Sequence, residues 1–172
     1  MSKILKPTFF SQPTILVAQK LLGKFLVRKI GGKNIAKKIT EVEVYDGIKD
    51  RGSHAFRGQT KRNFVMFGPA GYWYVYLNYG MHWMLNIVTE NKNYPAAILI
   101  RGVDGISGPG KVTKFFKINK FFNNKLALPK NKLWIEDRGI KIKKSQIKKG
   151  PRIGIDYAGP YWSKRHLRFW IE

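Results

Sequence analysis

The 172 residues are enough for one compact domain with a hydrophobic core, and they carry 33 Lys and Arg against 10 Asp and Glu, a formal net charge of +23. That balance predicts a polyanionic partner, either nucleic acid or an anionic membrane, while 44% hydrophobic and 14% aromatic residues exclude a disordered basic tail. The absence of cysteine excludes disulfides, thiolate metal sites and thiol nucleophiles.

The first part of the chain predicts one helix followed by two strands. Ser11 to Leu22 is typical of a helix, with Ser11 as its cap and Pro13 in its first turn. Lys24 to Ile30 predicts a strand, which a Gly-Gly turn joins to a second strand over Ile35 to Tyr45. Alternation along this second strand predicts two faces, one with Thr40, Val42 and Val44 and the other with Ile39, Glu41, Glu43 and Tyr45.

The rest of the chain predicts a long ordered loop, a hairpin and several short elements. The loop covers residues 46–71, and the hairpin strands are Tyr72 to Tyr79 and His82 to Thr89. Ala96 to Arg101 predicts a short buried strand. Lys111 to Asn119 predicts a helix whose side chains Val112, Phe115 and Phe116 face the core. Late strands are expected over Trp134 to Asp137, Arg152 to Tyr157 and Arg168 to Ile171.

These elements predict a single α+β domain, residues 1–172, with mainly antiparallel pairing. No run approaches the roughly 18 consecutive apolar residues that a membrane span needs, and the N-terminal residues lack the apolar segment and cleavage site of a secretory signal. We therefore expect an intracellular, cytoplasmic protein with no membrane partner.

Gly105 to Lys111 fits the first seven positions of a phosphate-binding P-loop. The eighth position, which must supply a hydroxyl to magnesium, is Val112, and Pro109 removes one of the amides that such a loop needs. We therefore favour a helix start with Pro109 in its first turn over a nucleotide triphosphatase. An intermediate interpretation is that the loop amides and Lys111 hold one phosphate of a nucleic-acid backbone.

The run from Tyr72 to Tyr79 is densely aromatic. Alternation places Tyr72, Tyr74 and Tyr76 on one face, and the other face carries Trp73, Val75 and Leu77. One face can fill the core, while the tyrosine face either stacks an unpaired base or is an ordinary tyrosine-rich sheet face. Tyr79 lies at the hairpin tip, where a bulky side chain can enter a duplex as a wedge.

Four of the ten acids lie between residues 41 and 50: Glu41, Glu43, Asp46 and Asp50. A carboxylate near nucleic acid weakens binding, so this cluster needs a chemical or structural reason. Glu43 shares a strand face with Tyr45, which suits a base that activates water against an electron-poor carbon, although a solvent-facing Glu also fits the alternation. The three histidines are far apart in sequence, with no Cys and no His-x-Glu, so we expect no metal site.

Short motifs follow one another in order from about Leu21 to Phe169. They are Glu43-Val-Tyr45, Ser53-His54-Ala55, Gly58-Gln-Thr60, Arg62-Asn63, Met66-Phe67, Gly71, Tyr74-Val-Tyr76, Tyr79-Gly80-Met81, Asn86-Ile87, Leu99-Ile-Arg101, Ser107-Gly-Pro109, Lys111 and Arg152-Ile-Gly154. This ordered set resembles the alkyladenine (3-methyladenine) DNA glycosylase family. The resemblance implies a curved, mainly antiparallel sheet with flanking helices and a protruding β-hairpin, similar to the formyltransferase C-terminal domain.

The resemblance implies a cofactor-free monomer that slides on duplex DNA, flips a damaged purine and hydrolyses its bond to the sugar. Substrates would be 3-methyladenine and 7-methylguanine, with hypoxanthine and ethenoadenine as further candidates. Glu43 matches the general base that activates water, and Arg101 matches a residue that helps hold this water. The base-binding pocket would consist of Tyr45, His54, Tyr76 and Asn86, of which Asn86 rejects guanine.

The resemblance also indicates how DNA is held. Tyr79 matches the residue that fills the gap in the base stack, with Met66 and Leu99 as apolar neighbours. Phosphate contacts are expected from Thr60, Arg62, Lys111 and Lys114. Two departures stand out: Val44 replaces the usual Ala and is expected to tighten the pocket floor, and a short 102–107 segment is expected to remove a DNA-contacting loop.

Two other functions remain open from the residues. One is a bifunctional glycosylase that uses a Lys imine, since the chain is rich in lysine. The other is a basic RNA-binding protein without enzymatic activity, which would leave the arrangement of Glu43, Tyr45 and His54 without a purpose.

Overall fold

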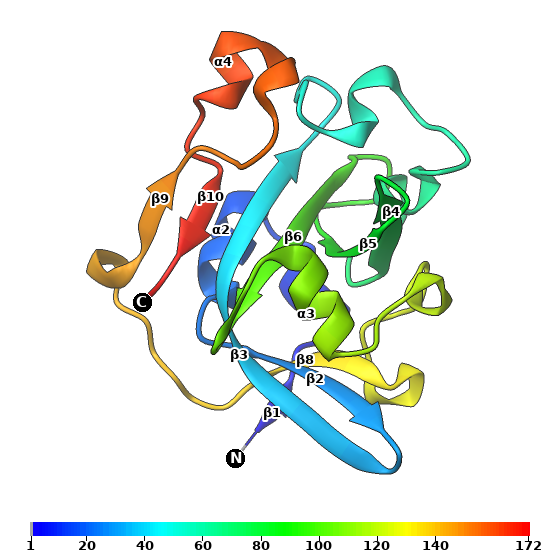
Figure 1. Cartoon of the computed structure of the whole chain (residues 1–172), viewed down its shortest axis with the longest axis vertical. Helices are drawn as coiled ribbons and strands as arrows, with labels where there is room; N and C mark the ends of the chain where they lie inside the picture. The colour runs from blue at the N-terminus through cyan, green and yellow to red at the C-terminus, as the bar shows by residue number, and fades with distance from the viewer. Residues whose placement is uncertain (1) are drawn as a thin grey trace.

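One long strand, β3 (Lys33–Asp46), organises the sheet in the computed structural model, which describes residues 2–172 (Figure 1). Its first half pairs with β2 (Phe25–Ile30). Its second half pairs with β6 (Ala96–Val103) on one side and β10 (Arg168–Trp170) on the other. Residues far apart in the chain therefore meet along the second half of β3.

The described strands form one open sheet in which every pairing is antiparallel. Its order is β1 (Lys3–Ile4), β8 (Leu133–Asp137), β2, β3, β6, β5 (His82–Val88) and β4 (Trp73–Asn78). Three short strands lie off this path: β7 (Ile106–Ser107) pairs with β6, β10 pairs with β3, and β9 (Lys148–Gly150) pairs with β10.

Four short α-helices accompany the sheet: α1 (Pro7–Phe10), α2 (Thr14–Leu21), α3 (Pro109–Phe115) and α4 (Gly159–Ser163). Six 3₁₀ turns complete the described secondary structure: η1 (His54–Arg57), η2 (Phe64–Phe67), η3 (Lys120–Phe122), η4 (Pro129–Asn131), η5 (Lys144–Gln146) and η6 (Asp156–Ala158). This content agrees with the predicted α+β class. No helix within residues 2–172 has the length and hydropathy needed to cross a bilayer.

Helix α2 begins at Thr14, three residues after the predicted start. Ser11 instead ends α1, and Pro13 is extended with a ψ of 130°. The backbone N–H and the hydroxyl of Thr14 both donate to the Glu90 carboxylate, at 2.8 and 3.2 Å. A carboxylate 76 residues away therefore satisfies the helix start, which no local pattern could indicate.

The predicted alternation in β3 is wrong at Ile39. Register shifts flank Glu41 in the pairing with β6, and Ile39 lies in the main core together with Val42 and Val44. A β-bulge inserts one extra residue and changes which face the following side chains occupy. Glu41 and Glu43 remain on the face opposite Val42, as the sequence predicted.

The hairpin β4–β5 alternates as predicted. Trp73 and Val75 belong to the main core, whereas Tyr74 belongs to a smaller apolar cluster, against which Tyr72 and Tyr76 pack. Because Tyr74 is only 1% exposed, its ring is part of the protein interior rather than a surface for stacking.

Two predictions for the later chain are wrong. Arg152 to Tyr157 forms no strand: Pro151 has no N–H, Ile153 donates its N–H to a side chain, and Gly154 has a φ of +76°. The adjacent β9 takes the place beside β10. In α3, Val112 and Phe116 are buried as predicted, but Phe115 is 40% exposed and lies under the Lys37 ammonium.

Candidate active site

A cavity of about 230 Å³ opens between the hairpin, β6 and the 153–157 segment. Pockets for drug-sized ligands are about 300–1,000 Å³, so this one suits a smaller group. It is lined by Tyr45, Gly52, Ser53, His54, Met66, Tyr74, Tyr76, Asn78, Tyr79, Met84, Asn86, Leu99, Arg101, Pro109, Ile153, Gly154, Ile155 and Tyr157. All the predicted base-binding and intercalating residues are therefore together around one cavity.

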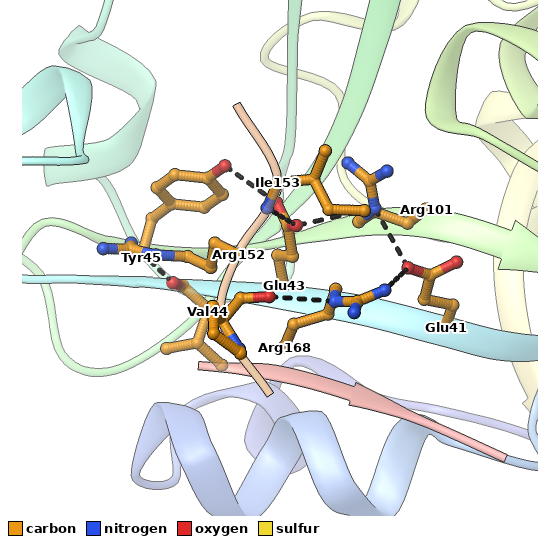
Figure 2. Close-up of polar contacts among 9 residues, drawn as sticks. Glu41, Glu43, Val44, Tyr45, Arg101, Arg152, Ile153 and Arg168 are labelled. Carbon is orange, nitrogen blue, oxygen red and sulfur yellow. Dashed lines mark hydrogen bonds and ion pairs between the residues drawn. The ribbon is translucent and has the colours of Figure 1, made fainter. Parts of the chain in front are cut away.

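Glu43 lies directly behind the cavity wall and is completely buried. Its Oε1 accepts the Ile153 N–H at 2.8 Å and lies 3.5 Å from Arg101 Nε, while its Oε2 accepts the Tyr45 hydroxyl at 2.9 Å (Figure 2). Ile153, Arg101 and Tyr45 all line the cavity, although Glu43 itself does not. The carboxylate thus sits one residue layer from the space that a ligand would occupy.

Burial raises the pKa of Glu43, and the nearby Arg101, the Ile153 N–H and the Tyr45 hydroxyl only partly offset this effect. Burial and the Glu43 charge raise the pKa of Tyr45 well above its ordinary value, so the phenol stays protonated and donates. A carboxylate with a raised pKa is a better proton acceptor than an exposed one, which suits a general base.

A buried ion pair between Asp50 and Arg152 fixes this arrangement. The guanidinium donates to both Asp50 oxygens at 2.6 and 2.7 Å and to the Val44 carbonyl at 2.9 Å, and both charged side chains are fully buried. The same guanidinium lies 4.8 Å from the centre of the Tyr45 ring. Arg152 therefore ties the segment that carries the Ile153 N–H to the strand that carries Glu43.

Asp50 also organises the loop that precedes η1. Its two oxygens accept the backbone N–H groups of Asp46 and Gly52, and its carbonyl accepts that of Ser53. A Cβ at Gly52 would lie 2.7 Å from the Arg152 guanidinium, so only glycine fits there. This packing brings His54, the first residue of η1, to the cavity.

His54 forms one wall of the cavity with two tyrosines. Its Nδ1 is 2.9 Å from the Tyr74 hydroxyl, and its ring centre is 4.5 Å from that of Tyr76. His54 is an exposed residue as a whole, yet burial of its ring, with a smaller effect of the Arg62 charge, lowers its pKa to about 4. The imidazole is therefore neutral at neutral pH.

The remaining pocket and intercalation candidates differ sharply in exposure. Asn86 is buried and donates its amide to the Tyr74 carbonyl at 3.1 Å. Met66 and Leu99 are buried in the cavity wall, whereas Tyr79, at the hairpin tip with a φ of 48°, is 85% exposed. A large aromatic ring presented to solvent at the mouth of a cavity is suited to contact a ligand.

The four predicted phosphate contacts lie outside the cavity. Thr60 and Arg62 line a neighbouring hollow, which also contains Arg51 and Arg57. Lys111 and Lys114 are exposed on α3, which touches the cavity only through Pro109. Val44, expected in the pocket floor, instead packs in the main core on the other face of β3.

Several residues contribute to the site without a role predicted from the sequence. Ile153 holds the Glu43 carboxylate, Asp50 and Arg152 anchor the surrounding loops, and Tyr157 lines the rim with its hydroxyl 3.2 Å from the Gly52 carbonyl. The Arg152-Ile-Gly154 motif was the available signal. Among residues 2–172, no group of three His, Asp or Glu side chains is placed to bind a metal ion.

Comparison with known proteins identifies the relatives of this chain. A family model for methylpurine-DNA glycosylase (MPG) matches residues 8–107 and 103–172. A protein of Legionella pneumophila (strain Paris) is 41% identical over 179 residues, which span 100% of this chain and 96% of the relative. A relative from Methanocella arvoryzae is 42% identical, and the match covers 91% of this chain and 86% of the relative. A relative from Myxococcus xanthus is 38% identical, and the match covers 98% of this chain and 90% of the relative. All three carry the name 3-methyladenine DNA glycosylase.

Replacing Asp50 by Ala should destabilise the fold by about 3–5 kcal/mol, because the Arg152 charge is then buried without a partner. Urea unfolding followed by tryptophan fluorescence measures the loss. The matched control is Glu172→Gln, which removes an exposed ion pair with Lys148 and should leave the unfolding midpoint unchanged. Equal effects of the two substitutions would show that the buried Asp50–Arg152 pair does not hold the Ile153 segment against β3.

The His54 imidazole should titrate with a pKa of about 4 in NMR spectra of the folded protein. Because the unfolded chain takes up this proton near pH 6.5, the contribution of His54 to stability is complete above that pH and is lost as the pH falls toward the folded pKa. Unfolding curves of the protein and of His54→Gln should therefore converge as the pH is lowered. A His54 titration near pH 6.5 in the folded state would contradict the buried environment.

Proposed function

This chain belongs to the methylpurine-DNA glycosylase family, and from that premise we propose that it flips alkylated purines out of duplex DNA and hydrolyses their bond to the sugar. The observation that carries the proposal is the buried Glu43 carboxylate, held by hydrogen bonds from Tyr45 and Ile153 and by an ion pair with Arg101, immediately behind a cavity with aromatic walls. The net charge of +23 suits binding to DNA phosphates, which is independent of sequence and sensitive to salt.

In the proposed reaction, Glu43 removes a proton from water while the water oxygen bonds to the sugar C1′. The bond between C1′ and the purine nitrogen breaks, and its electron pair leaves with the base. Alkylation at N3 or N7 makes the purine cationic, so the base departs neutral without a proton donor. Arg101 would help hold the water, since Arg101 and Ile153 both line the cavity and both contact Glu43 Oε1.

The walls of the cavity support base binding. Tyr45, His54 and Tyr76 would sandwich the flipped base, and electron-rich tyrosine faces attract a cationic purine. A neutral His54 adds no positive charge to repel this purine. Asn86 would exclude guanine by contact with its amino group, and Tyr79 would occupy the gap in the duplex, next to Met66 and Leu99.

Outside the cavity, Thr60, Arg62, Lys111 and Lys114 are proposed phosphate contacts, and the protein would act as a monomer on chromosomal DNA in the cytoplasm. The antiparallel sheet and the exposed tip of the β4–β5 hairpin are compatible with a fold like the formyltransferase C-terminal domain. Hypoxanthine and ethenoadenine stay candidate substrates, although they are neutral and must be protonated on leaving, for which no acid is assigned.

The proposal is tested by release of free base from duplexes that carry 3-methyladenine, 7-methylguanine, hypoxanthine or ethenoadenine. Release of the two methylated purines is expected. Borohydride trapping of a covalent DNA adduct would instead favour a Lys imine mechanism. Equal binding of undamaged RNA without base release would favour an RNA-binding protein.

Glu43→Gln should lower the rate of 7-methylguanine release by about 10²-fold or more, while lesion binding is retained, because the amide keeps the shape but accepts no proton. In the unsubstituted protein, release should fall as the pH is lowered, since protonated Glu43 cannot act as a base. The midpoint should lie above the ordinary Glu pKa of about 4.3, because burial raises the pKa of Glu43. Single-turnover kinetics across pH measure the rate loss and the pH dependence. Undiminished release by Glu43→Gln would contradict the assignment of Glu43 as the general base.

Tyr79→Ala should weaken capture of a lesion duplex by roughly tenfold, because the ring no longer fills the gap in the stack. Fluorescence anisotropy with a labelled 7-methylguanine duplex measures the affinity. Tyr161→Ala is the matched control, since Tyr161 is also exposed but lies on α4 outside the cavity. Unchanged affinity for Tyr79→Ala would argue against the wedge.

A further inference from the structure

A row of alternating charged side chains extends from Glu43, the proposed general base, into the protein. Arg101 Nε lies 3.5 Å from Glu43 Oε1 and donates to Glu41 Oε1 at 3.1 Å. Arg168 donates to the same Glu41 oxygen at 3.1 Å (Figure 2). Glu41 therefore binds two arginines, and one of them, Arg101, contacts the proposed general base Glu43. The family resemblance and the pocket lining assign no function to Glu41.

Two features of the backbone and one hydrogen bond from a side chain define the surroundings of Glu41. The register shifts of the β-bulge lie on either side of it, and bulges near active sites redirect side chains. Gly102, directly after Arg101, faces Glu41, and a Cβ there would lie 3.0 Å from the Glu41 Cβ. Arg168 also donates its Nε to the Pro151 carbonyl, so the Glu41 cluster is joined to the segment that holds Glu43.

The geometry of Arg101 shows what Glu41 contributes. Its Nε is closer to Glu41 than to Glu43, and Figure 2 shows its terminal nitrogens pointing away from Glu41. Within residues 2–172 these nitrogens make no hydrogen bond, and Arg101 lines the cavity. Without Glu41, a guanidinium beside a buried carboxylate would favour a bidentate pair with Glu43, which would occupy the oxygens that must receive the proton.

We propose that Glu41 is a positioning residue: by binding Arg101 through Nε, it directs the terminal guanidinium nitrogens into the cavity and leaves Glu43 free to accept a proton from water. This inference rests on the proposed glycosylase activity. Glu41 touches neither the base nor the sugar, so its whole effect on the reaction passes through Arg101.

The test is a double-mutant cycle in single-turnover release of 7-methylguanine. Glu41→Ala should lower the maximal rate by roughly 10²-fold, the usual cost of a misplaced group, without changing the enzyme concentration at half-maximal rate. The acid side of the pH profile should move to lower pH, because Arg101 then approaches Glu43 and lowers its pKa. In an Arg101→Ala background, Glu41→Ala should have no further effect.

Two additional variants separate positioning from folding. Glu41→Gln keeps an acceptor for Arg101 Nε and should recover a large part of the lost rate. If Glu41→Ala fails to fold, Glu41→Met, which keeps the volume but removes the acceptor, takes its place in the cycle. Glu136→Ala is the matched control. Glu136 is likewise paired with an arginine, Arg138, and is even less exposed than Glu41, but it lies on β8, which does not line the cavity. Its release rate should be unchanged.

Several outcomes would overturn the inference. They are a full rate for Glu41→Ala, an equal loss in both backgrounds, no recovery with Glu41→Gln, or an equal loss for Glu136→Ala. The proposed function fails differently: the unsubstituted protein itself would release no base from the duplex.

Discussion

The buried ion pair between Asp50 and Arg152 is the constraint on which the site depends. It joins the loop after β3 to a segment that follows it by about a hundred residues, and it also satisfies the Val44 carbonyl and the Gly52 N–H. A buried charge is costly unless it is paired and hydrogen-bonded, so separating the two segments would carry a large free-energy cost. That arrangement delivers the Ile153 N–H to Glu43 and His54 to the cavity.

The few acidic side chains have different roles from the many lysines. Lysines on the surface suit DNA binding, where a local carboxylate would only weaken affinity. Glu43 and Asp50 avoid this conflict because they are buried, and Glu41 is mostly shielded from solvent. All three contact arginines, namely Arg101, Arg152 and Arg168. Of the four acids between residues 41 and 50, Glu43 is the proposed base and Glu41 and Asp50 each bind arginines, while Asp46 has no assigned role.

Local patterns predicted the elements whose side chains alternate regularly. The hairpin strand from Trp73 places its tyrosines and its core residues on the predicted faces. Patterns failed where a distant residue intervened. The start of α2 differs from the prediction because Thr14 binds Glu90, and Ile39 lies in the core because the register shifts at Glu41. The strand predicted at Ile153 does not form because the Ile153 N–H binds Glu43. Such contacts leave no local signal, because each partner is an ordinary residue in its own surroundings.

By itself, the sequence determined that the chain folds, that its partner is polyanionic, and, through its ordered motifs, the family to which it belongs. Net charge, apolar content and strand periodicity are properties of neighbouring residues or of the whole composition, so they can be counted directly. Only the tertiary structure decided which carboxylate is buried at the cavity and which carboxylates support it. That decision depends on contacts across 60, 102, 110 and 127 residues, which exist only after the sheet has assembled.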